Sequence, residues 1–310
     1  MAHLQILNNS LRFVLPKSLR LGWFLLKMIL PISLAVRLLD YYGGLEFLAK
    51  YLTPIFQYIG LSGNTAIVFL TSMFLPLYAP IAIVTSMAIT MREATILALM
   101  CLLSHNLLVE TAIQKSTGSS FIKMFVMRVS MSFVIAFTLN AIMPHNGFKE
   151  WMVTASMTKA NSIVEILQLW LYSSGKIAIL IISVITALMV IQRLLLEYKL
   201  LEPFAKSLSP LMKLFGLPEA TGFSWIVGNV VGLAYGGAIM IAEVKEGRLS
   251  KEDSDLLNHH LAINHSMIED NLLFIVLGIS AWWIIITRLV FAFIVVWMQR
   301  TYLHLRQRFS

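Results

Sequence analysis

Two short polar stretches interrupt an otherwise apolar chain, and their residue types could carry chemistry. They read SHNLLVET from residue 104 and NHSMIEDN from residue 264. Each combines a histidine and a carboxylate with amide or hydroxyl groups, which can bind a cation, relay a proton or hydrogen-bond a polar solute. The candidates for a substrate or ion pathway in these stretches are His105, Asn106, Glu110, His265, Ser266, Glu269 and Asp270.

Ionisable side chains are expensive inside a bilayer, at about 2.5–3.5 kcal/mol each on insertion scales, and therefore mark functional sites by default. One interpretation is that these groups line the path of a solute or ion. The other is that Glu110 and Asp270 are counter-ions of Arg128 and Arg288, which lie inside later apolar segments and would form structural ion pairs with them. The two interpretations are compatible.

A metal site is a further alternative for the same groups. Histidine with carboxylate suits iron, zinc or manganese, and the candidate ligands are His105, Glu110, His265 and Asp270. A proton-relay role for the histidines is equally open. The chain has a single cysteine, Cys101, which excludes a multi-thiolate metal site and a disulfide framework.

Helical spacing limits which of these side chains can meet. Asn106 and Glu110 are four residues apart and share one face of a helix, as do His265 and Glu269. His105 precedes Glu110 by five residues, which places the two about 140° apart around a regular helix. They converge only where the helix is unwound, so joint chemistry by these residues requires an interruption at this point.

Two apolar segments upstream of the polar stretches also carry helix-breaking residues. Residues 64–90 contain Pro76 and Pro80, and residues 220–243 contain the motif GLAYGG. Prolines and glycines are different routes to an interrupted helix, and either a kinked spanning helix or a re-entrant hairpin fits. Broken backbone at membrane depth exposes groups that recognise ions. The residues at the breaks that could contact a solute are Tyr78 and Tyr235.

The composition indicates a polytopic helical membrane protein. The 310 residues are 58% hydrophobic and 13% charged, with a mean hydropathy of +0.79, and apolar runs of spanning length recur along the chain. The first long apolar run lacks a small-residue cleavage site, so we expect no cleavable signal. The net charge of +8 is typical of cytoplasmic loops in a membrane protein and does not indicate a nucleic-acid partner.

The chain repeats one unit twice. Residues 37–61 and 193–217 align without a gap at 12 identical positions of 25, and the polar stretches recur downstream at a slightly longer offset. Each copy contains an apolar helix, a short interfacial helix, the broken segment, the helix with the polar centre and a closing apolar helix. The predicted domains are a first repeat at 1–143, an interfacial linker at 144–167, expected to be helical, and a second repeat at 168–310.

Basic residues discriminate between two topologies. If each broken segment is a re-entrant hairpin, each repeat has three spanning helices, the repeats are inverted, and 15 basic residues lie inside against 5 outside. If the segments span, the repeats are parallel and the division is 12 against 8. The positive-inside rule favours the first arrangement. The predicted fold is therefore an all-α polytopic membrane protein of two inverted repeats, with six spans and both termini cytoplasmic.

These motifs together resemble the Gate, or nucleoside-recognition, domain. The resemblance rests on the interfacial helix ending in Gly-Leu, the broken hairpin, the central S-H-N-x-x-x-E-T and the closing helix, over about residues 20–143 and 168–303. The domain occurs in the membrane part of the ferrous iron transporter FeoB, in spore maturation proteins A and B and in concentrative nucleoside transporters, where analogous parts form inverted repeats. The chain lacks the GTPase loop of FeoB and the extra scaffold helices of the nucleoside transporters. The resemblance thus implies architecture rather than substrate.

We expect an integral membrane transporter or permease for a small solute or ion, with its site at mid-membrane between the repeats and no enzymatic activity. Any coupling would be to H⁺ or Na⁺, because the chain carries no nucleotide-binding loop, and a divalent metal is the other candidate ligand. Expected partners are the lipid bilayer, the solute and, as an open alternative, a second copy in a homo-oligomer. The expected location is the bacterial cytoplasmic (inner) membrane. The alternative functions are a non-transporting membrane assembly or partner protein and a metal-dependent intramembrane enzyme.

Overall fold

The computed structural model of the chain consists almost entirely of helices. It describes residues 2–85, 87–144, 150–151, 162–198, 200 and 207–309. The chain forms two compact units, each of which combines segments from both halves of the sequence. The first comprises Met1–Cys101 and Ala136–Glu197, and the second comprises Leu102–Ile135 and Tyr198–Ser310. The predicted division into repeats concerns equivalence in sequence and stays a prediction.

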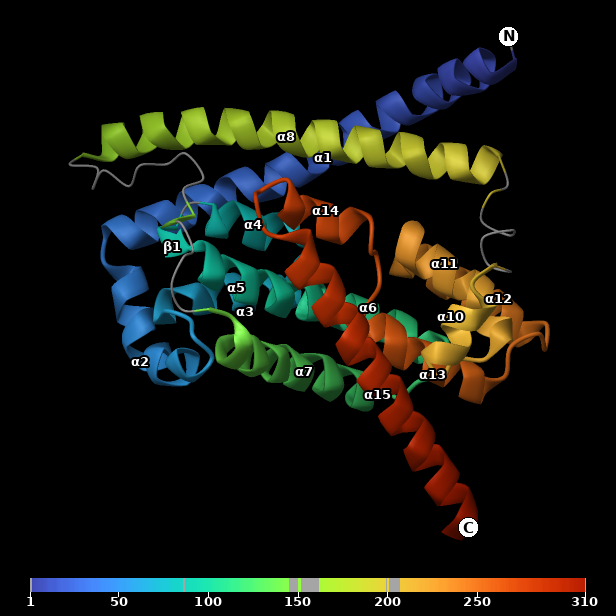
Figure 1. Cartoon of the computed structure of the whole chain (residues 1–310). Helices are drawn as coiled ribbons and strands as arrows, with labels where there is room; N and C mark the ends of the chain where they lie inside the picture. Colours follow the sequence, from blue (N-terminus) through green and yellow to red (C-terminus); the bar gives the residue numbers. More distant parts are fainter. Residues whose placement is uncertain are drawn as a thin grey trace. The chain divides into compact units, whose positions relative to one another are not determined.

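Long helices dominate the first unit. Its elements are α1 (Ala2–Tyr41), α2 (Gly44–Tyr58), η1 (Gly63–Thr65), α3 (Ala66–Phe74), α4 (Tyr78–Val84), β1 (Ile89–Thr90), most of α5 (Met91–Ser104), the end of α7 (Phe121–Ile142), β2 (Glu150–Trp151) and α8 (Ile163–Glu197). α1 packs against α8, and Figure 1 shows α1 crossing α8 obliquely. α4 packs against both α1 and α3. The first broken segment is therefore covered by protein on its α4 side.

The interruption predicted between residues 64 and 90 lies between α3 and α4. α3 ends at Phe74, and Leu75 is extended with φ −126° and ψ 157°. Pro76 explains this conformation, because proline disfavours the helical conformation in the residue before it. Pro80 lies in the first turn of α4, where its missing amide hydrogen removes no helical hydrogen bond.

The linker between the halves contributes a short strand. β1 pairs with β2 in antiparallel fashion, with Ile89 opposite Trp151. We expected an interfacial helix over residues 144–167, but Trp151 is in this strand, where the two extended segments satisfy each other's backbone groups. Of the remaining linker, residues 145–149 and 152–161 lie outside the described residues.

The second unit gathers helices from both halves of the sequence. Its elements are the end of α5, α6 (Leu107–Ser116), α7 (Phe121–Ile142) as far as residue 135, α10 (Ser209–Leu214), η2 (Glu219–Thr221), α11 (Gly222–Val230), α12 (Leu233–Lys245), α13 (Lys251–Ile263), α14 (Glu269–Ile275) and α15 (Ala281–Phe309). An apolar core joins α10, α12, α13 and α15, with Met212, Leu257 and Val296 fully buried in it. This core fixes α13 and α15, which flank the second polar stretch.

α11 and α12 fold back on each other as a tight helical hairpin. Gly228 and Gly236 meet so closely that a Cβ atom on Gly236 would lie 2.7 Å from the Gly228 Cα. Ser224 Oγ donates to Glu243 Oε2 at 2.5 Å, which joins the two arms further from the turn. The turn lies at Gly232, whose φ of 111° favours glycine. The second broken segment is thus a hairpin and not a continuous kinked helix.

Both polar stretches interrupt a helix. Residues 105–106 separate α5 from α6, with a bend of 41° between the two helices. Residues 264–268 separate α13 from α14. Asn106 and Ser266 hold equivalent positions, and both have a left-handed conformation, with φ of 48° and 47°. Asparagine is several-fold enriched in this conformation, so a polar residue at this turn has a backbone reason as well as a chemical one.

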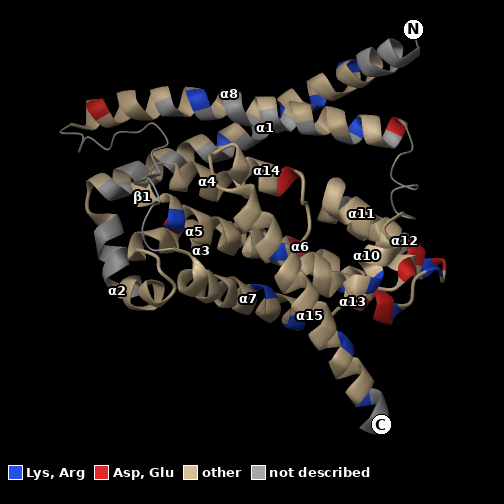
Figure 2. Ribbon diagram, in the orientation of Figure 1, with Lys and Arg blue, Asp and Glu red and all other residues tan. Residues whose placement is uncertain are grey.

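Two helices in the described part of the chain are long and apolar enough to cross a membrane. They are α7, from Phe121 to Ile142, and α15, from Ala281 to Arg306. The bent pair of α5 and α6 passes the same test when taken together. In Figure 2 most of α7 and the first half of α15 carry few charges, whereas Lys and Arg recur toward the end of α15. The six predicted spans and their inverted arrangement stay predictions.

Candidate functional site

Two buried arginines bond the backbone at the two interruptions. A helix that stops leaves the carbonyl groups of its last turn without helical partners. Arg128 on α7 donates from Nε to the Leu103 carbonyl at 2.7 Å and from Nη2 to the His105 carbonyl at 3.0 Å. Arg288 on α15 donates to the equivalent carbonyls at 3.0 and 2.6 Å. Both guanidinium groups therefore satisfy the carbonyls that the interruptions release.

The acidic residues of the two stretches differ in their arginine contacts. Glu110 Oε2 lies 2.6 Å from Arg128 Nη2 in a buried ion pair. We expected Arg288 to pair with Asp270 in the same way, but Arg288 Nη1 instead donates to Asn271 Oδ1. Within the described part of the chain, Asp270 contacts no arginine. The two stretches therefore supply one carboxylate that is paired with an arginine and one that is not.

Side-chain type accompanies this difference. The first turns are alike, because the amides of Glu110 and Asp270 donate to the carbonyls four residues earlier at 3.0 and 3.1 Å. Asp270 is one methylene shorter than Glu110, and the residue after it is Asn271, where the first stretch has Thr111. The asparagine offers Arg288 a side-chain oxygen, so the sequence carries a sign of the difference.

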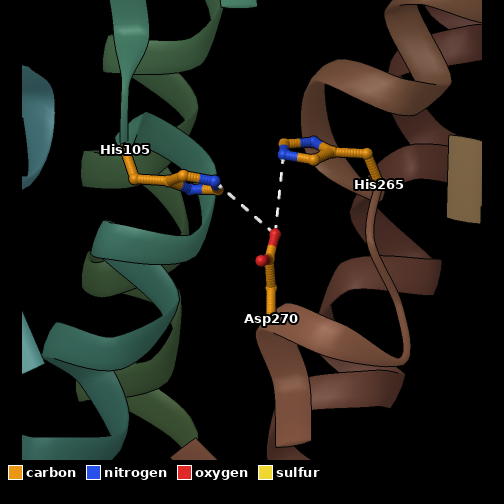
Figure 3. Close-up of side chains that lie close together, drawn as sticks. All are labelled: His105, His265 and Asp270. Carbon is orange, nitrogen blue, oxygen red and sulfur yellow. Dashed lines mark ion pairs between the residues drawn. The ribbon is translucent and has the colours of Figure 1, made fainter. Parts of the chain in front are cut away.

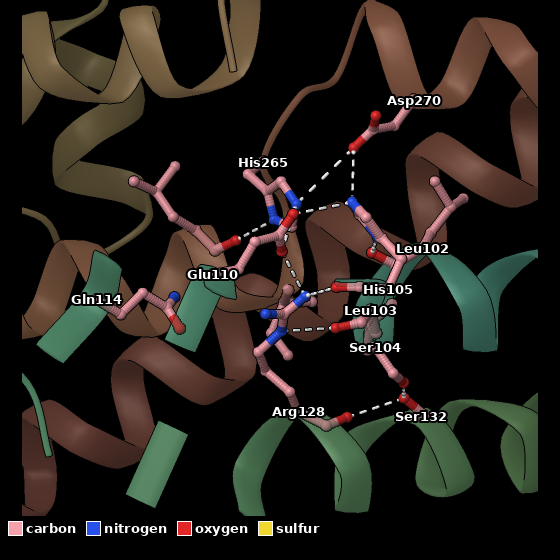
Figure 4. Close-up of polar contacts among 12 residues, drawn as sticks. Leu102, Leu103, Ser104, His105, Glu110, Gln114, Arg128, Ser132, His265 and Asp270 are labelled. Atoms are coloured by element: carbon pink, nitrogen blue, oxygen red, sulfur yellow. Dashed lines mark hydrogen bonds and ion pairs between the residues drawn. The ribbon is translucent and has the colours of Figure 1, made fainter. Parts of the chain in front are cut away.

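Four side chains from the two stretches meet in one buried cluster. His105 Nε2 lies 3.0 Å from Glu110 Oε1 and 3.5 Å from Asp270 Oδ2. His265 Nε2 lies 3.3 Å from Glu110 Oε2 and 3.8 Å from Asp270 Oδ2. The ring centroids are 5.2 Å apart, and Figure 4 shows both rings turned toward the carboxylates. Each carboxylate thus faces both histidines.

Backbone carbonyls orient both imidazole rings. His105 Nδ1 donates to the Leu102 carbonyl at 3.1 Å, and His265 Nδ1 donates to the Leu261 carbonyl at 2.7 Å. Because a carbonyl oxygen only accepts hydrogen bonds, Nδ1 carries the proton in each ring. Nε2 is therefore the atom that faces the carboxylates and can take up a proton or a metal ion. The arrangement can hold a positive species between nitrogen and oxygen atoms.

Asn106 and Ser266 contribute to the site through their backbone. The Asn106 carbonyl accepts from the Glu110 amide at 3.0 Å, and the Ser266 carbonyl accepts from the Asp270 amide at 3.1 Å. Each turn residue thereby closes the first turn leading to the acid. The Ser266 amide also donates to the Gly228 carbonyl at 3.0 Å. This bond ties the α11–α12 hairpin to the second interruption.

Three further pathway candidates are not brought into the cluster by any described contact. Tyr78 begins α4 in the first unit, and its side chain is buried. Tyr235 is in α12, and its side chain lies outside the described residues. Glu269 begins α14 directly before Asp270 and is partly exposed. The pathway roles of these residues stay predictions.

A second polar layer joins α6 and α13, and the sequence reasoning missed it. Gln114 Nε2 donates to the Asn258 carbonyl at 3.1 Å, and Asn258 Nδ2 donates to Ser119 Oγ at 2.9 Å. Ser119 Oγ in turn donates to Asp255 Oδ1 at 2.6 Å. A signal was present, because Gln114 lies four residues after Glu110 and continues the same helix face. Extending that face by one turn would have found the layer.

Known proteins share sequence features with the chain. The family model of Gate, described as nucleoside recognition, matches residues 23–143. The chain is 31% identical over 270 residues to the uncharacterized membrane protein YvoD of Bacillus subtilis (strain 168), with 86% of each chain covered. No solved structure matches the chain. The region matched by the family model contains His105, Glu110 and Arg128.

Proposed function

Because the chain belongs to the Gate, or nucleoside-recognition, family of membrane proteins, we propose that it is a permease for a small solute or ion. The Gate family is found in proteins related to membrane transport. The proposed path passes the cluster of His105, Glu110, His265 and Asp270. The name of the family does not fix the substrate, because one fold serves many functions.

The convergence of two interrupted helices on one cluster carries this proposal. A structural ion pair needs only Glu110 and Arg128, which are bonded at 2.6 Å. The cluster also holds two histidines and Asp270, a carboxylate without an arginine contact among the described residues. Such groups are expensive at membrane depth, and in membrane proteins they mark solute and ion pathways.

We also propose that the chain contains two Gate-like repeats of inverted topology in the bacterial cytoplasmic membrane. The repeated arginine–carbonyl bonds and the left-handed turns at Asn106 and Ser266 support two equivalent copies. The distribution of basic residues, 15 against 5, supports inversion with both termini cytoplasmic. In this arrangement the α3–α4 and α11–α12 segments are re-entrant.

Uptake into proteoliposomes tests the permease proposal. Purified protein is reconstituted and challenged with radiolabelled uridine, inorganic phosphate, Na⁺ and Zn²⁺, one at a time. We expect at least one probe to enter faster than into protein-free vesicles, and we expect Asp270→Asn to slow that uptake at least tenfold. Asp255→Asn is the matched control, because Asp255 bonds Ser119 and Gln299 in the second polar layer. Entry of every probe at the rate of protein-free vesicles would contradict the proposal.

A further inference from the structure

Two buried polar atoms in the cluster, His265 Nε2 and Asp270 Oδ2, make no hydrogen bond of good geometry among the described residues and face each other at 3.8 Å. The nearest carboxylate oxygen to His265 Nε2 is Glu110 Oε2 at 3.3 Å, which Arg128 already holds. Because the Nδ1 proton of His265 is donated to the Leu261 carbonyl, Nε2 of the neutral ring presents a lone pair to the carboxylate. Burying two acceptors against each other costs free energy unless a proton or a metal ion lies between them.

His105 extends the same arrangement from the other stretch. Its Nε2 lies 3.5 Å from Asp270 Oδ2, and Figure 3 shows both histidine rings pointing at this carboxylate. Histidines that bind metals almost always donate their other ring nitrogen to a carbonyl, a carboxylate or water, which fixes the tautomer and the ring. Both histidines of the cluster have this bond, to the Leu102 and Leu261 carbonyls.

The spacing of the three side chains also suits an ion. The nearest ligand atoms of His105, His265 and Asp270 all lie within 4.8 Å of one another. With bonds of about 2.0–2.1 Å, neighbouring ligands of a tetrahedral ion are about 3.3–3.4 Å apart. The separations of 3.5 and 3.8 Å from Asp270 Oδ2 are slightly longer, so small side-chain shifts would close the site around an ion. Glu110 Oε2, at 3.3 Å from His265 Nε2, offers a further oxygen.

We propose that His105, His265 and Asp270 bind a divalent first-row transition-metal ion, with Glu110 beside them. Two imidazole nitrogens and a carboxylate suit Zn²⁺, Mn²⁺ or Fe²⁺ better than Mg²⁺ or Ca²⁺, which prefer oxygen ligands alone. Divalent transition-metal ions are then the class of substrate that the permease transports, and this part of the inference rests on the proposed permease function. Arg128 pairs with Glu110, so Asp270 is the carboxylate of the cluster that has no arginine contact among the described residues.

Calorimetric titration with Zn²⁺ tests the binding itself. Tag-free protein is treated with a chelator, kept in detergent micelles and titrated with Zn²⁺ alone. We expect one ion per chain, and we expect Asp270→Asn and His265→Gln each to weaken binding more than tenfold, because loss of even an outer-shell partner typically costs about 10–100-fold. Asp255→Asn is the matched control and should bind as the unaltered chain does. Size-exclusion chromatography of each variant identifies any that fails to fold.

Three outcomes overturn the metal site. They are the absence of one-to-one binding by the unaltered chain, unchanged affinity in folded Asp270→Asn, and equal weakening by Asp255→Asn. The visible absorption of bound Co²⁺ gives a second readout, since a site with two imidazole ligands should lose its spectrum in His105→Gln. Binding without uptake of any probe would contradict the permease and leave the metal site standing. Uptake of uridine or phosphate without Zn²⁺ binding would contradict the metal site and leave the permease standing.

Discussion

Glu110 and Asp270 hold equivalent positions in the two polar stretches, yet only Glu110 is bonded to an arginine. A buried charge that loses its partner costs about 3–5 kcal/mol, and neutralising Glu110 would leave Arg128 in that state, whereas Asp270 contacts no arginine among the described residues. The two acids therefore have separable roles. Glu110 contributes to the stability of the first interruption, and Asp270 is available to a ligand.

Neutralising each acid in turn should separate these roles. Glu110→Gln should lower the free energy of unfolding by about 3–5 kcal/mol, because Arg128 is then left buried without its counter-charge. Asp270→Asn should lower it by clearly less, because this change leaves no buried arginine without its counter-charge. Unfolding in detergent micelles, followed by circular dichroism against increasing denaturant, measures both. Equal losses in the two variants would show that the structural difference between the acids has no energetic counterpart.

The condition for contact between His105 and Glu110 could be predicted from the sequence, but the partner of Arg288 could not. The five-residue spacing excludes contact on a regular helix, so contact requires an interruption, and the structure has one. The bond from Arg288 to Asn271 depends on which of two neighbouring polar side chains reaches the guanidinium group, and that is decided by packing of the folded turn. The facing of His265 Nε2 and Asp270 Oδ2 depends on the same packing.

Among the helices, the α11–α12 hairpin is the element on which the second interruption rests. Its arms meet at Gly228 and Gly236, and its Gly228 carbonyl accepts from the Ser266 amide at 3.0 Å. Close approach of two helices requires residues without side chains at the contact. The hairpin therefore positions the turn that carries His265, and a change in its packing should be felt at the cluster.

Gly236→Ala tests this coupling. The added Cβ would lie 2.7 Å from the Gly228 Cα, so the arms must separate, and we expect a loss of about 1–3 kcal/mol in the free energy of unfolding. Gly175→Ala is the matched control, because no atom lies within 4 Å of its added Cβ, and alanine should stabilise α8 by up to about 1 kcal/mol. Thermal unfolding in micelles compares the two. A neutral or stabilising Gly236→Ala would refute tight packing of the hairpin.

Prolines and glycines made the positions of the helix interruptions predictable. Whether each interruption is a kink or a hairpin was not predictable. Pro76 and the glycines around residue 232 both mark ends of helices, as expected. Whether such a segment kinks or folds back depends on which surfaces pack, and the contact of Gly228 with Gly236 determines this in the second segment. Trp151 shows the opposite case. Its polar surroundings suggested an interfacial helix, whereas pairing with Ile89 places it in a strand.

For the whole molecule, the repeated sequence leads to a prediction about sidedness. Tyr42 and Tyr198 are identical residues at equivalent positions, and they are 71% and 37% exposed. Inverted repeats place these two positions on opposite sides of the membrane, whereas parallel repeats place them on the same side. The count of basic residues favours inversion, with Tyr42 outside and Tyr198 cytoplasmic.

Cysteine labelling at the two tyrosines tests the inversion. Tyr42→Cys and Tyr198→Cys are made separately with Cys101→Ser and exposed to a membrane-impermeant maleimide in spheroplasts. We expect Tyr42→Cys to react in intact spheroplasts and Tyr198→Cys to react only after the membrane is permeabilised. Reaction of both variants under the same condition would support parallel repeats instead.

Access of water-soluble reagents to the polar interruptions tests the central claim most directly. Ser266→Cys and Asn106→Cys are made separately with Cys101→Ser, reconstituted and treated with a small, charged methanethiosulfonate added to either side of the membrane. If the cluster lies on a solute path, both cysteines react and Zn²⁺ slows the reaction. The unaltered chain, whose buried Cys101 is 1% exposed, should stay unmodified. Cysteines at 106 and 266 that stay as unreactive as Cys101 from both sides would contradict the account.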